Sequence, residues 1–379
     1  MAELYSSSEA AALSSLSQEA VDHINRVLED QGLAGSGHVA IQTTGSDSVA
    51  AGADDAAVVV TSASSHDVAV DGGEHGSAVI MGDSGAIHLT GLGNDTVFAS
   101  DGGDTITAGA GDATIHGGLG NDSLVGGTAG GNHTLYGGGG HDTLLGGSGM
   151  DTLWAGTDGS YLAGGANGHT EIHAGGGGDT IRSTGGYDTI FGAGAAIETH
   201  GDHTLIHSNG DTISAHGAYD TIDGSVSHAG SSVNAYGEHA TILGGAGDDT
   251  IMLHDTSGAG AYAFGGDGAD SITGSTGGNA TLSGGAGDDY IMAYGVGDSV
   301  MGGDGSDYFQ IAHYGTGHDT LDGGAGMDVV HFDDRHFADA HIATNNHTTL
   351  VTFGDSYSAS ITNVEQLRFS DTVYNITNT

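Results

Sequence analysis

The sequence contains no cysteine, no proline and no lysine, and it is almost without positive charge. Its 379 residues include 49 acidic side chains but only four arginines, which gives a formal net charge of −45 at pH 7. The absence of cysteine excludes disulfides and thiolate metal sites. Nucleic acid and anionic membrane surfaces are excluded as expected partners, because both require clustered cations. A chain this acidic also repels itself unless cations neutralise it, so divalent metal ions are the candidate ligands.

The sequence also lacks the apolar segments that membranes and secretion signals require. No stretch is long enough and apolar enough to span a bilayer, so we expect no transmembrane segment. Residues 1–21 lack the basic start and the apolar centre of a secretory signal peptide. We therefore expect that any export uses another route.

Glycine, in contrast, is abundant, and it recurs with a fixed period. Residues 139–156 read GGHDTLLGGSGMDTLWAG, in which one phrase occurs twice, nine residues apart. The apolar residue of this phrase recurs at the same step from Val97 to Leu124 and from Leu135 to Leu162. A single apolar residue in every nine cannot form the stripe of a helix. The period instead predicts short strands joined by six-residue turns and stacked as a solenoid.

The turn of each phrase combines glycines with one aspartate, and both have a physical reason. Glycine adopts positive φ and allows close backbone approach at little cost. The aspartate stands just before the strand, so each turn offers backbone carbonyl oxygens and one carboxylate. Turns of neighbouring coils can surround a cation that prefers oxygen ligands, as calcium does. The phrase therefore predicts a calcium-binding turn followed by a strand.

This phrase resembles the nonapeptide of the RTX (repeats-in-toxin) family, G-G-x-G-x-D followed by x-apolar-x. Eight stretches match all six turn positions: 117–122, 137–142, 146–151, 244–249, 265–270, 284–289, 302–307 and 323–328. The resemblance covers residues 90–330 and implies a parallel β-roll that binds multiple calcium ions between its turns. It also implies a secreted bacterial protein, exported through a type I system by an uncleaved C-terminal signal. Many RTX proteins carry a protease, lipase or toxin domain before the repeats, and we expect none here because only a short region precedes them in this sequence.

The first segment, residues 1–36, is predicted to form an amphipathic helix that caps the first coil. One face of this helix gathers Leu13, Leu16, Ala20, Val21, Ile24, Val27 and Leu28. Serines before the helix offer an N-cap, and Gly32 offers a stop. Solenoid ends need such a cover because their strand edges are open. The alternative is a helix that anchors or assembles the protein.

Residues 37–89 and 331–379 flank the repeats. The first segment is interpreted as metal-poor coils, with a separate small β-domain as the alternative. The apolar residues assigned to its coils are Ile41, Val49, Val59, Val68 and Ile80. The second segment is expected to form a non-repetitive β cap. It contains NVEQLRFSD at residues 363–371, which resembles the phrase that follows RTX rolls, and we expect it to carry the secretion signal.

A roll with two strands per coil places successive turns on alternate edges, so a metal site needs a turn and the turn two repeats later. Counting from Asp95, one edge is nearly complete and carries Asp104, Asp122, Asp142, Ser160, Asp179, Asp211, Ser231, Asp249, Asp270, Asp289, Asp307 and Asp328. The other edge is interrupted and carries Asp95, Ala113, His133, Asp151, Thr170, Asp188, His203, Asp220, Ala240, Ala280, Asp298 and Asp319. We predict that the aspartates of both series are calcium ligands, densest from Asp249 to Asp328. The nine-residue spacing is interrupted within residues 190–211, so the count along each edge does not run unbroken from the first half of the chain to the second.

Histidine is also frequent, with 23 residues. His133 and His203 are assigned to the aspartate position of a turn, where their nitrogen atoms suit calcium poorly. The stretch HFDDRHF at residues 331–337 fits no established signature of a transition-metal site. Roles at the surface or in pH sensing are therefore expected for these histidines.

The strand residues that point outward form a second pattern. On one sheet, six rings recur about every second repeat: Phe98, His116, Tyr136, Trp154, His173 and Phe191. Stacked coils bring such rings about 4.8 Å apart. We predict that this row is an interface, most simply with another copy of the protein, so that the protein forms a homo-oligomer or polymer. The alternative is that the rings only stabilise the sheet.

The sequence shows no H-E-x-x-H, no G-x-S-x-G and no phosphate loop with lysine. Its carboxylates fall in phase with the repeat, which calcium binding explains better than acid–base catalysis. We therefore expect no enzyme, but an extracellular structural protein that folds on calcium after export and self-assembles in a surface layer, a filament or a biofilm matrix. The alternatives are an adhesin, an ice-binding module that uses a row of outward threonines, and an enzyme of an unrecognised class.

Overall fold

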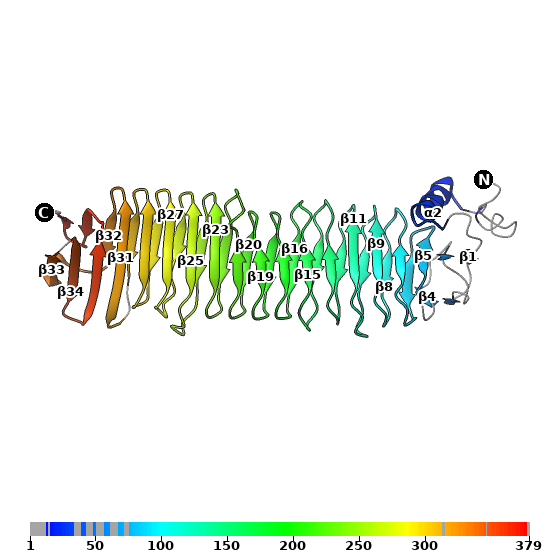
Figure 1. Cartoon of the computed structure of the whole chain (residues 1–379), viewed down its shortest axis with the longest axis horizontal. Coiled ribbons are helices and arrows are strands. Elements are labelled where there is room, and N and C mark those ends of the chain that lie inside the picture. Colours follow the sequence, from blue (N-terminus) through cyan, green and yellow to red (C-terminus); the bar gives the residue numbers. More distant parts are fainter. Residues whose placement is uncertain are drawn as a thin grey trace. The chain divides into compact units, whose positions relative to one another are not determined.

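The structure is a computed structural model that describes residues 13, 16–33, 39–42, 48–50, 57–60, 67–71, 76–312, 315–345 and 347–376. The chain divides into two compact units, Met1–Ala195 and Ala196–Thr379. Both units consist of short strands stacked in parallel (Figure 1). The expected fold class, an all-β parallel solenoid with a helix near the N-terminus and further strands near the C-terminus, is confirmed.

In the first unit, each coil contributes one strand to each of two sheets. One sheet contains β1 (Val39–Gln42), β3 (Ala57–Val60), β5 (Ala78–Met81), β7 (Thr96–Phe98), β9 (Thr114–Gly118), β11 (Thr134–Gly138), β13 (Thr152–Trp154), β15 (Glu171–His173) and β17 (Thr189–Phe191). The other contains β2 (Ser48–Ala50), β4 (Asp67–Asp71), β6 (Ala86–Leu89), β8 (Thr105–Thr107), β10 (Ser123–Val125), β12 (Thr143–Leu145), β14 (Tyr161–Ala163) and β16 (Thr180–Ser183). Parallel pairing thus continues from β1 and β2 into the glycine-rich repeats.

The core between the two sheets is built from the apolar residue that recurs in the sequence. Val97, Ile115 and Leu135 are in register on one sheet, and Leu124 and Leu144 are in register on the other. All five side chains have 0% of their surface exposed. Each strand therefore contributes one central apolar side chain, and the turns between the strands hold most of the remaining residues.

The first coils differ from the sequence prediction by one residue. Pairing of β5 with β7 places Val79 beside the inward Val97 and Ile80 beside the outward Phe98. Val59 is in register with Ile80 and therefore also lies on the outer face. All four residues of β3 are buried, so alternation of apolar and polar residues cannot indicate which face is inward. The prediction that Val59 and Ile80 are the inward apolar residues of their coils was therefore wrong. The side chains of Ile41 and Val49 lie outside the described residues.

Helix α2 (Gln18–Asp30) covers this apolar outer face. The Ser17 hydroxyl caps its first turn by accepting a hydrogen bond from the Ala20 N–H at 3.1 Å. The helix ends just before Gly32, which has a φ of +68°. Its apolar face packs against the outer side of β3 and β5 in a cluster of Leu13, Ile24, Val27, Leu28, Ala57, Val59 and Ile80. The helix therefore lies over several coils, on the same face that continues into Phe98.

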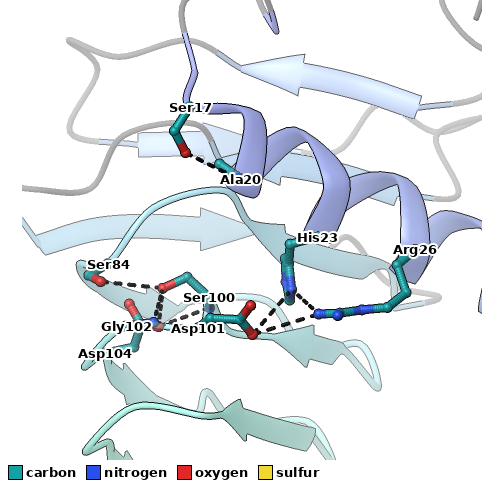
Figure 2. A network of polar contacts seen from close by, with 9 residues as sticks. All are labelled: Ser17, Ala20, His23, Arg26, Ser84, Ser100, Asp101, Gly102 and Asp104. Carbon is teal, nitrogen blue, oxygen red and sulfur yellow. Dashed lines mark hydrogen bonds and ion pairs between the residues drawn. The ribbon is translucent and has the colours of Figure 1, made fainter.

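Polar side chains of α2 reach a nearby turn (Figure 2). Arg26 Nη2 lies 3.6 Å from Asp101 Oδ1 and 3.0 Å from His23 Nδ1. His23 Nδ1 lies 3.8 Å from the same Asp101 oxygen. Burial lowers the pKa of His23, which favours its neutral form. Asp101 belongs to the turn that ends at Asp104, so α2 is connected to a turn of the predicted metal-binding edge.

The second unit repeats the same architecture. One sheet contains β19 (Leu205–His207), β21 (Thr221–Asp223), β23 (Thr241–Ala246), β25 (Tyr262–Asp267), β27 (Thr281–Ala286), β29 (Ser299–Asp304) and β31 (Gly317–Ala325). The other contains β18 (Ala196–Thr199), β20 (Thr212–Ala215), β22 (Ser232–Ala235), β24 (Thr250–Leu253), β26 (Ser271–Thr273), β28 (Tyr290–Ala293), β30 (Tyr308–Ile311) and β32 (Val329–Phe332).

The last strands of the second unit close both sheets. A short 3-10 turn, η1 (Phe337–Asp339), leads into the antiparallel strands β33 (Ala340–Asn345), β34 (Thr348–Phe353) and β35 (Tyr357–Thr362). β35 pairs in parallel with β31. β36 (Gln366–Arg368) pairs in parallel with β32 and antiparallel with β37 (Val373–Asn375). These strands cover the final coil with non-repetitive structure.

Candidate metal sites in the turns

The aspartates predicted as ligands end their turns just before a strand, and all of them are buried. None is more than 2% exposed, including Asp95, Asp122 and Asp289. A solvated turn residue does not need such burial, and a buried carboxylate needs partners for both of its oxygens. The two oxygens of these carboxylates have different surroundings.

The first oxygen of each carboxylate bonds to the neighbouring coil. Asp142 Oδ1 accepts a hydrogen bond from the Asp122 N–H at 2.8 Å, and Asp122 Oδ1 accepts one from the Asp104 N–H at 2.8 Å. The same 2.8 Å bond joins Asp289 Oδ1 to the Asp270 N–H. Each bond connects equivalent turn positions on adjacent coils. The aspartates therefore form ladders along the edges of the roll.

These hydrogen bonds assign the turn residues to series within each unit. In the first unit they connect Asp104, Asp122, Asp142, Ser160 and Asp179 in one series, and Ala113, His133, Asp151 as well as Thr170, Asp188 in the other. In the second unit they connect Ser231, Asp249, Asp270, Asp289, Asp307 and Asp328 in one series, and Thr204, Asp220 as well as Ala280, Asp298, Asp319 in the other. Backbone hydrogen bonds extend the series that contains Asp249. The Ser231 N–H donates to Asp249 Oδ1, and the Ser231 carbonyl accepts from the Thr250 N–H. The Ser232 N–H donates to the Asp211 carbonyl of the preceding coil.

The structure corrects one position of the second series. The strand after this turn is Leu205–His207, whose inward residue is Ile206. The turn position two residues before Ile206 is Thr204, which is 1% exposed and donates its N–H to Asp220 Oδ1 at 2.8 Å. His203 is exposed instead and has a φ of +62°. The assignment of His203 to the aspartate position was therefore wrong by one residue.

The second oxygen is buried without a hydrogen-bond partner among the described residues at most of these turns. This holds for Oδ2 of Asp122, Asp142, Asp151, Asp220, Asp249, Asp270, Asp289, Asp298, Asp307 and Asp328. Burial raises the pKa of Asp122 and Asp289 to about 7. Burial likewise raises the pKa of Asp142, Asp151, Asp220, Asp270, Asp298 and Asp328 to about 6. Ionised at neutral pH, these oxygens require a positive charge nearby.

The first glycine of each phrase leaves room beside that oxygen. A Cβ atom added to Gly265 would lie 2.1 Å from Asp270 Oδ2 and 2.7 Å from the Gly284 carbonyl oxygen of the next coil. A Cβ atom on Gly302 would lie 2.0 Å from Asp307 Oδ2. The space therefore lies between a carboxylate oxygen and a backbone carbonyl. Oxygen donors of these two kinds are the ligands that calcium prefers. The residues present thus fit a calcium ion.

At five of the predicted ligands the second oxygen bonds to the protein instead. Asp319 Oδ2 accepts a hydrogen bond from the Tyr357 hydroxyl at 2.7 Å, and Asp104 Oδ2 accepts one from the Ser100 hydroxyl at 2.8 Å. The Ser183 hydroxyl donates to Asp188 Oδ2. Backbone N–H groups donate to the second oxygens of Asp179 and Asp211, from Gly175 and Asn209 respectively. In these turns a protein donor already bonds the second carboxylate oxygen.

Glu365 and Tyr357 were not predicted, and both complete a series at its C-terminal end. Glu365 Oε2 accepts a hydrogen bond from the Asp328 N–H at 2.9 Å. Each turn aspartate accepts the same kind of bond from the turn residue of the preceding coil. Leu367 is in register with the inward Val330, so Glu365 stands two residues before an apolar position. That spacing is the phase of the repeat and could have identified Glu365. Tyr357 lies far from Asp319 in the sequence and carries no such signal.

Comparison with protein families now adds to this geometry. A family model described as RTX calcium-binding nonapeptide repeat (4 copies) matches residues 89–124, 127–162, 173–196, 240–254, 264–295, 275–309 and 315–334. The chain is an RTX β-roll protein. Calcium is the ion that the family description assigns to these repeats. A comparison with curated proteins found no match. Among the residues that the structure describes, no helix of this RTX protein is long and apolar enough to cross a membrane.

The outward ring row of the first unit of this RTX protein stacks as predicted. Neighbouring rings from Phe98 to Phe191 have centroids between 3.6 and 6.2 Å apart and planes within 18° of parallel. Trp154 is 40% exposed, and the other five rings are half-buried. Burial lowers the pKa of His116, which favours an uncharged ring within the row. Stacking is thus established, whereas an interface at this row stays a prediction.

The second unit contains two ring ladders that were not predicted. The outer ladder consists of His200, His216, Tyr236 and His254, with centroids 4.3 to 4.8 Å apart. The turn ladder consists of His203, Tyr219 and His239, with centroids 4.7 to 5.0 Å apart. Each ring of the turn ladder stands at a positive φ, between +57° and +62°. The sequence signal is HGDH, HGAY and YGEH, which begin at residues 200, 216 and 236.

Proposed function

We propose that this protein is a secreted, non-catalytic structural β-roll that folds when calcium binds in its turns and then self-assembles outside the cell. The observation that carries this proposal is the repeated pair of a buried, unpartnered aspartate oxygen and a carbonyl oxygen of the next coil. Calcium supplies the positive charge that these buried carboxylates require. The RTX repeats are typical of secreted bacterial proteins, which supports the extracellular location.

The ten aspartates with an unpartnered second oxygen are the proposed main ligands. Their first oxygens are held by hydrogen bonds to the preceding coil, so each carboxylate is oriented before the ion arrives. Asp95, Asp104, Asp179, Asp188, Asp211 and Asp319 are proposed as weaker ligands or as structural residues. For the last five of these, the protein already bonds the second oxygen. Calcium should therefore bind most densely from Asp249 to Asp328.

Folding coupled to calcium also provides a reason for export in an unfolded state. The net charge of −45 and the 74 glycines both oppose folding of the metal-free chain. Calcium is scarce in the cytosol, so the chain would remain unfolded there and would fold after export. Residues 331–379 are proposed to act both as the C-terminal cap and as the carrier of the secretion signal.

Self-assembly is proposed to use the ring row of the first unit. The row presents an exposed Trp154 between half-buried rings, and aromatic anchors of this kind dominate many interfaces. Helix α2 covers the continuation of the same face at Val59 and Ile80, and Phe98 at the start of the row packs against this cluster, of which the later rings are not part. Calcium would lower the charge repulsion between copies and would build the face at the same time.

Removal and return of calcium tests the first half of the proposal. We expect circular dichroism of the protein in chelator to show a disordered chain, and millimolar calcium to restore the β signal. A native spectrum that survives the chelator would overturn calcium-dependent folding. The second half is tested by a Trp154→Ser, Tyr136→Ser variant in calcium, followed by light scattering and electron microscopy. If this variant folds and assembles like the parent, the ring row only stabilises the sheet.

A further inference from the structure

One cluster of metal-ligating side chains lies outside the turns that end at the predicted calcium ligands, which are called calcium-type turns below. Glu198, His200 and His216 place one carboxylate oxygen and two imidazole nitrogens within 4.8 Å of one another. Glu198 belongs to β18, and the two histidines follow β18 and β20 at the start of successive turns. The histidines are exposed and Glu198 is half-buried, so an ion in solution can reach the cluster.

The donor atoms of this cluster differ in kind from those of the calcium-type turns. Two of its three donors are imidazole nitrogens, which suit zinc, copper and nickel, whereas calcium prefers oxygen. Two histidines and one glutamate are an established ligand set of zinc, with the fourth position left to water. We propose that Glu198, His200 and His216 form a binding site for Zn²⁺ that is separate from the calcium-binding turns.

The distances support tetrahedral coordination. Glu198 Oε1 and His200 Nε2 lie 3.3 Å apart. Two ligands of one tetrahedral Zn²⁺ ion, with bonds of about 2.0–2.1 Å, are separated by about 3.3–3.4 Å. The His200 and His216 rings stack with centroids 4.8 Å apart and planes 14° from parallel. The ligand atoms of all three residues lie within 4.8 Å of one another, and the exposed His216 ring has to turn out of its stack to bring its nitrogen to the same ion.

The coils explain why this site occurs once in the outer ring ladder. Strand register aligns Glu198 with Ser214, Asn234 and Met252 on the following coils. Rings continue beside these positions at Tyr236 and His254, but only the first coil of the ladder adds a carboxylate next to a pair of histidines. Stacking of rings alone would not require a glutamate at this position.

The same turns supply a matched control. Tyr236 occupies the outer ladder one coil after His216, so a His216→Tyr variant keeps a stacked ring and removes a ligand. Tyr219 occupies the turn ladder next to His239 at a φ of +61°, so His239→Tyr is tolerated for the same reason. Glu198→Gln removes the carboxylate charge with almost no change of shape. Circular dichroism in saturating calcium establishes that each variant is folded.

Zinc binding to the full chain in saturating calcium tests the proposal. Equilibrium dialysis with Zn²⁺ should give one tight site per chain in the parent and in His239→Tyr, and excess calcium should not displace the ion. Co²⁺ added in place of zinc should give the visible absorption of tetrahedral nitrogen and oxygen coordination. We expect His216→Tyr to weaken zinc binding by more than about 100-fold, because loss of a ligand exceeds the effect of losing an outer partner. Glu198→Gln should weaken it by at least about tenfold.

Three results would overturn the site. The first is the absence of a saturable tight zinc site in the parent. The second is unchanged zinc affinity in folded His216→Tyr or Glu198→Gln. The third is an equal loss in His216→Tyr and His239→Tyr, which would show dispersed binding by the many histidines. Each measurement is made on calcium-loaded protein, so its result does not depend on how much calcium contributes to folding.

Discussion

The two edges of the second unit hold the same coil spacing by different means. The calcium-type edge consists of the turns that end at Asp249, Asp270, Asp289, Asp307 and Asp328. Its positive φ angles belong to glycines, such as +114° at Gly245 and +108° at Gly247. The ring edge consists of the turns on the opposite side, which end at Thr204, Asp220, Ala240, Ala261, Ala280, Asp298 and Asp319. Its first turns place histidine or tyrosine at positive φ and stack these rings from coil to coil.

This difference shows that a β-roll turn can obtain its positive φ either from glycine or from a ring that stacks on the neighbouring coil. A non-glycine residue in the left-handed region costs about 1–3 kcal/mol, and a stacked ring pair returns about 0.5–1.5 kcal/mol beyond its burial. Ring stacking therefore offsets much of the backbone cost without any ion. The calcium-type edge avoids that backbone cost through glycine, and each of its five turns buries an unpartnered carboxylate oxygen. Among the described turns of the ring edge, only those that end at Asp220 and Asp298 do so. We expect the two edges to respond to different perturbations.

The largest difference should come from removing carboxylates of the calcium-type edge. We expect Asp289→Ala combined with Asp307→Ala to lower calcium affinity more than about tenfold, because each change removes a charged ligand oxygen. Ser160→Ala combined with Thr170→Ala is the matched control, since both residues occupy the same turn position without a carboxylate. Isothermal titration calorimetry of metal-free protein measures both. Equal losses in the two double variants would show that the turn carboxylates are not the ligands.

A methyl group placed in the proposed ion position should have the next largest effect. The Cβ atom of Gly284→Ala would lie 2.0 Å from Asp289 Oδ2, and the backbone at Gly284 is not in the left-handed region. We expect weaker calcium binding and about 1–3 kcal/mol of lost stability in calcium, as for other overpacked sites. Gly354→Ala is the control, because its Cβ atom would meet nothing within 4 Å. Similar thermal midpoints for the two variants in calcium would contradict a filled space at Gly284.

The pH dependence of folding should reverse sign when calcium is removed. Burial raises the pKa of Asp122 and Asp289 to about 7, well above the value of 3.8 expected for an unfolded chain. The metal-free fold therefore binds more protons than the unfolded chain between these values, so its stability falls as pH rises from about 4 to about 7. With calcium bound the carboxylates must be ionised, so calcium affinity should fall as pH falls through 7 to 6.

Circular dichroism in chelator and thermal unfolding in calcium, each at pH 5 and pH 8, measure this reversal. In chelator we expect more β signal at pH 5 than at pH 8, where the chain is disordered, and in calcium we expect the higher thermal midpoint at pH 8. The double variant Asp289→Ala, Asp307→Ala should show a smaller difference in chelator, because it lacks two of the carboxylates that carry it. A β signal in chelator that rises with pH would refute the assigned direction.

The smallest effect should come from the ring edge. Tyr219 stacks between His203 and His239, and we expect Tyr219→Ser to reduce stability in calcium by about 1–3 kcal/mol. Calcium affinity at the other edge should stay within about twofold of the parent, since well-separated sites contribute independently. Denaturant unfolding and calorimetric titration test the two parts. A large loss of calcium affinity in this variant would mean that the edges are strongly coupled.

The sequence by itself determined the coil and the position of each turn aspartate. Both follow from a nine-residue period in which the strand residue, the glycines and the acid keep a constant phase, so no long-range information is needed. The central apolar residues, such as Leu135 and Leu144, are fully buried as that period predicts. The stacked ring row from Phe98 to Phe191 follows from the same arithmetic, because in-register parallel coils place equivalent residues side by side.

The tertiary structure decided features that depend on elements outside the local repeat. Val59 and Ile80 lie on the outer face because α2 covers it, and a strand that is apolar on both faces does not specify its own register. Asp319 and Asp328 have different surroundings because Tyr357 and Glu365 arrive from the C-terminal strands. Glu198, His200 and His216 form one cluster only because adjacent coils stack in register. A local sequence pattern can place a side chain within its coil, but which atoms finally surround that side chain depends on the packing of segments distant in the chain.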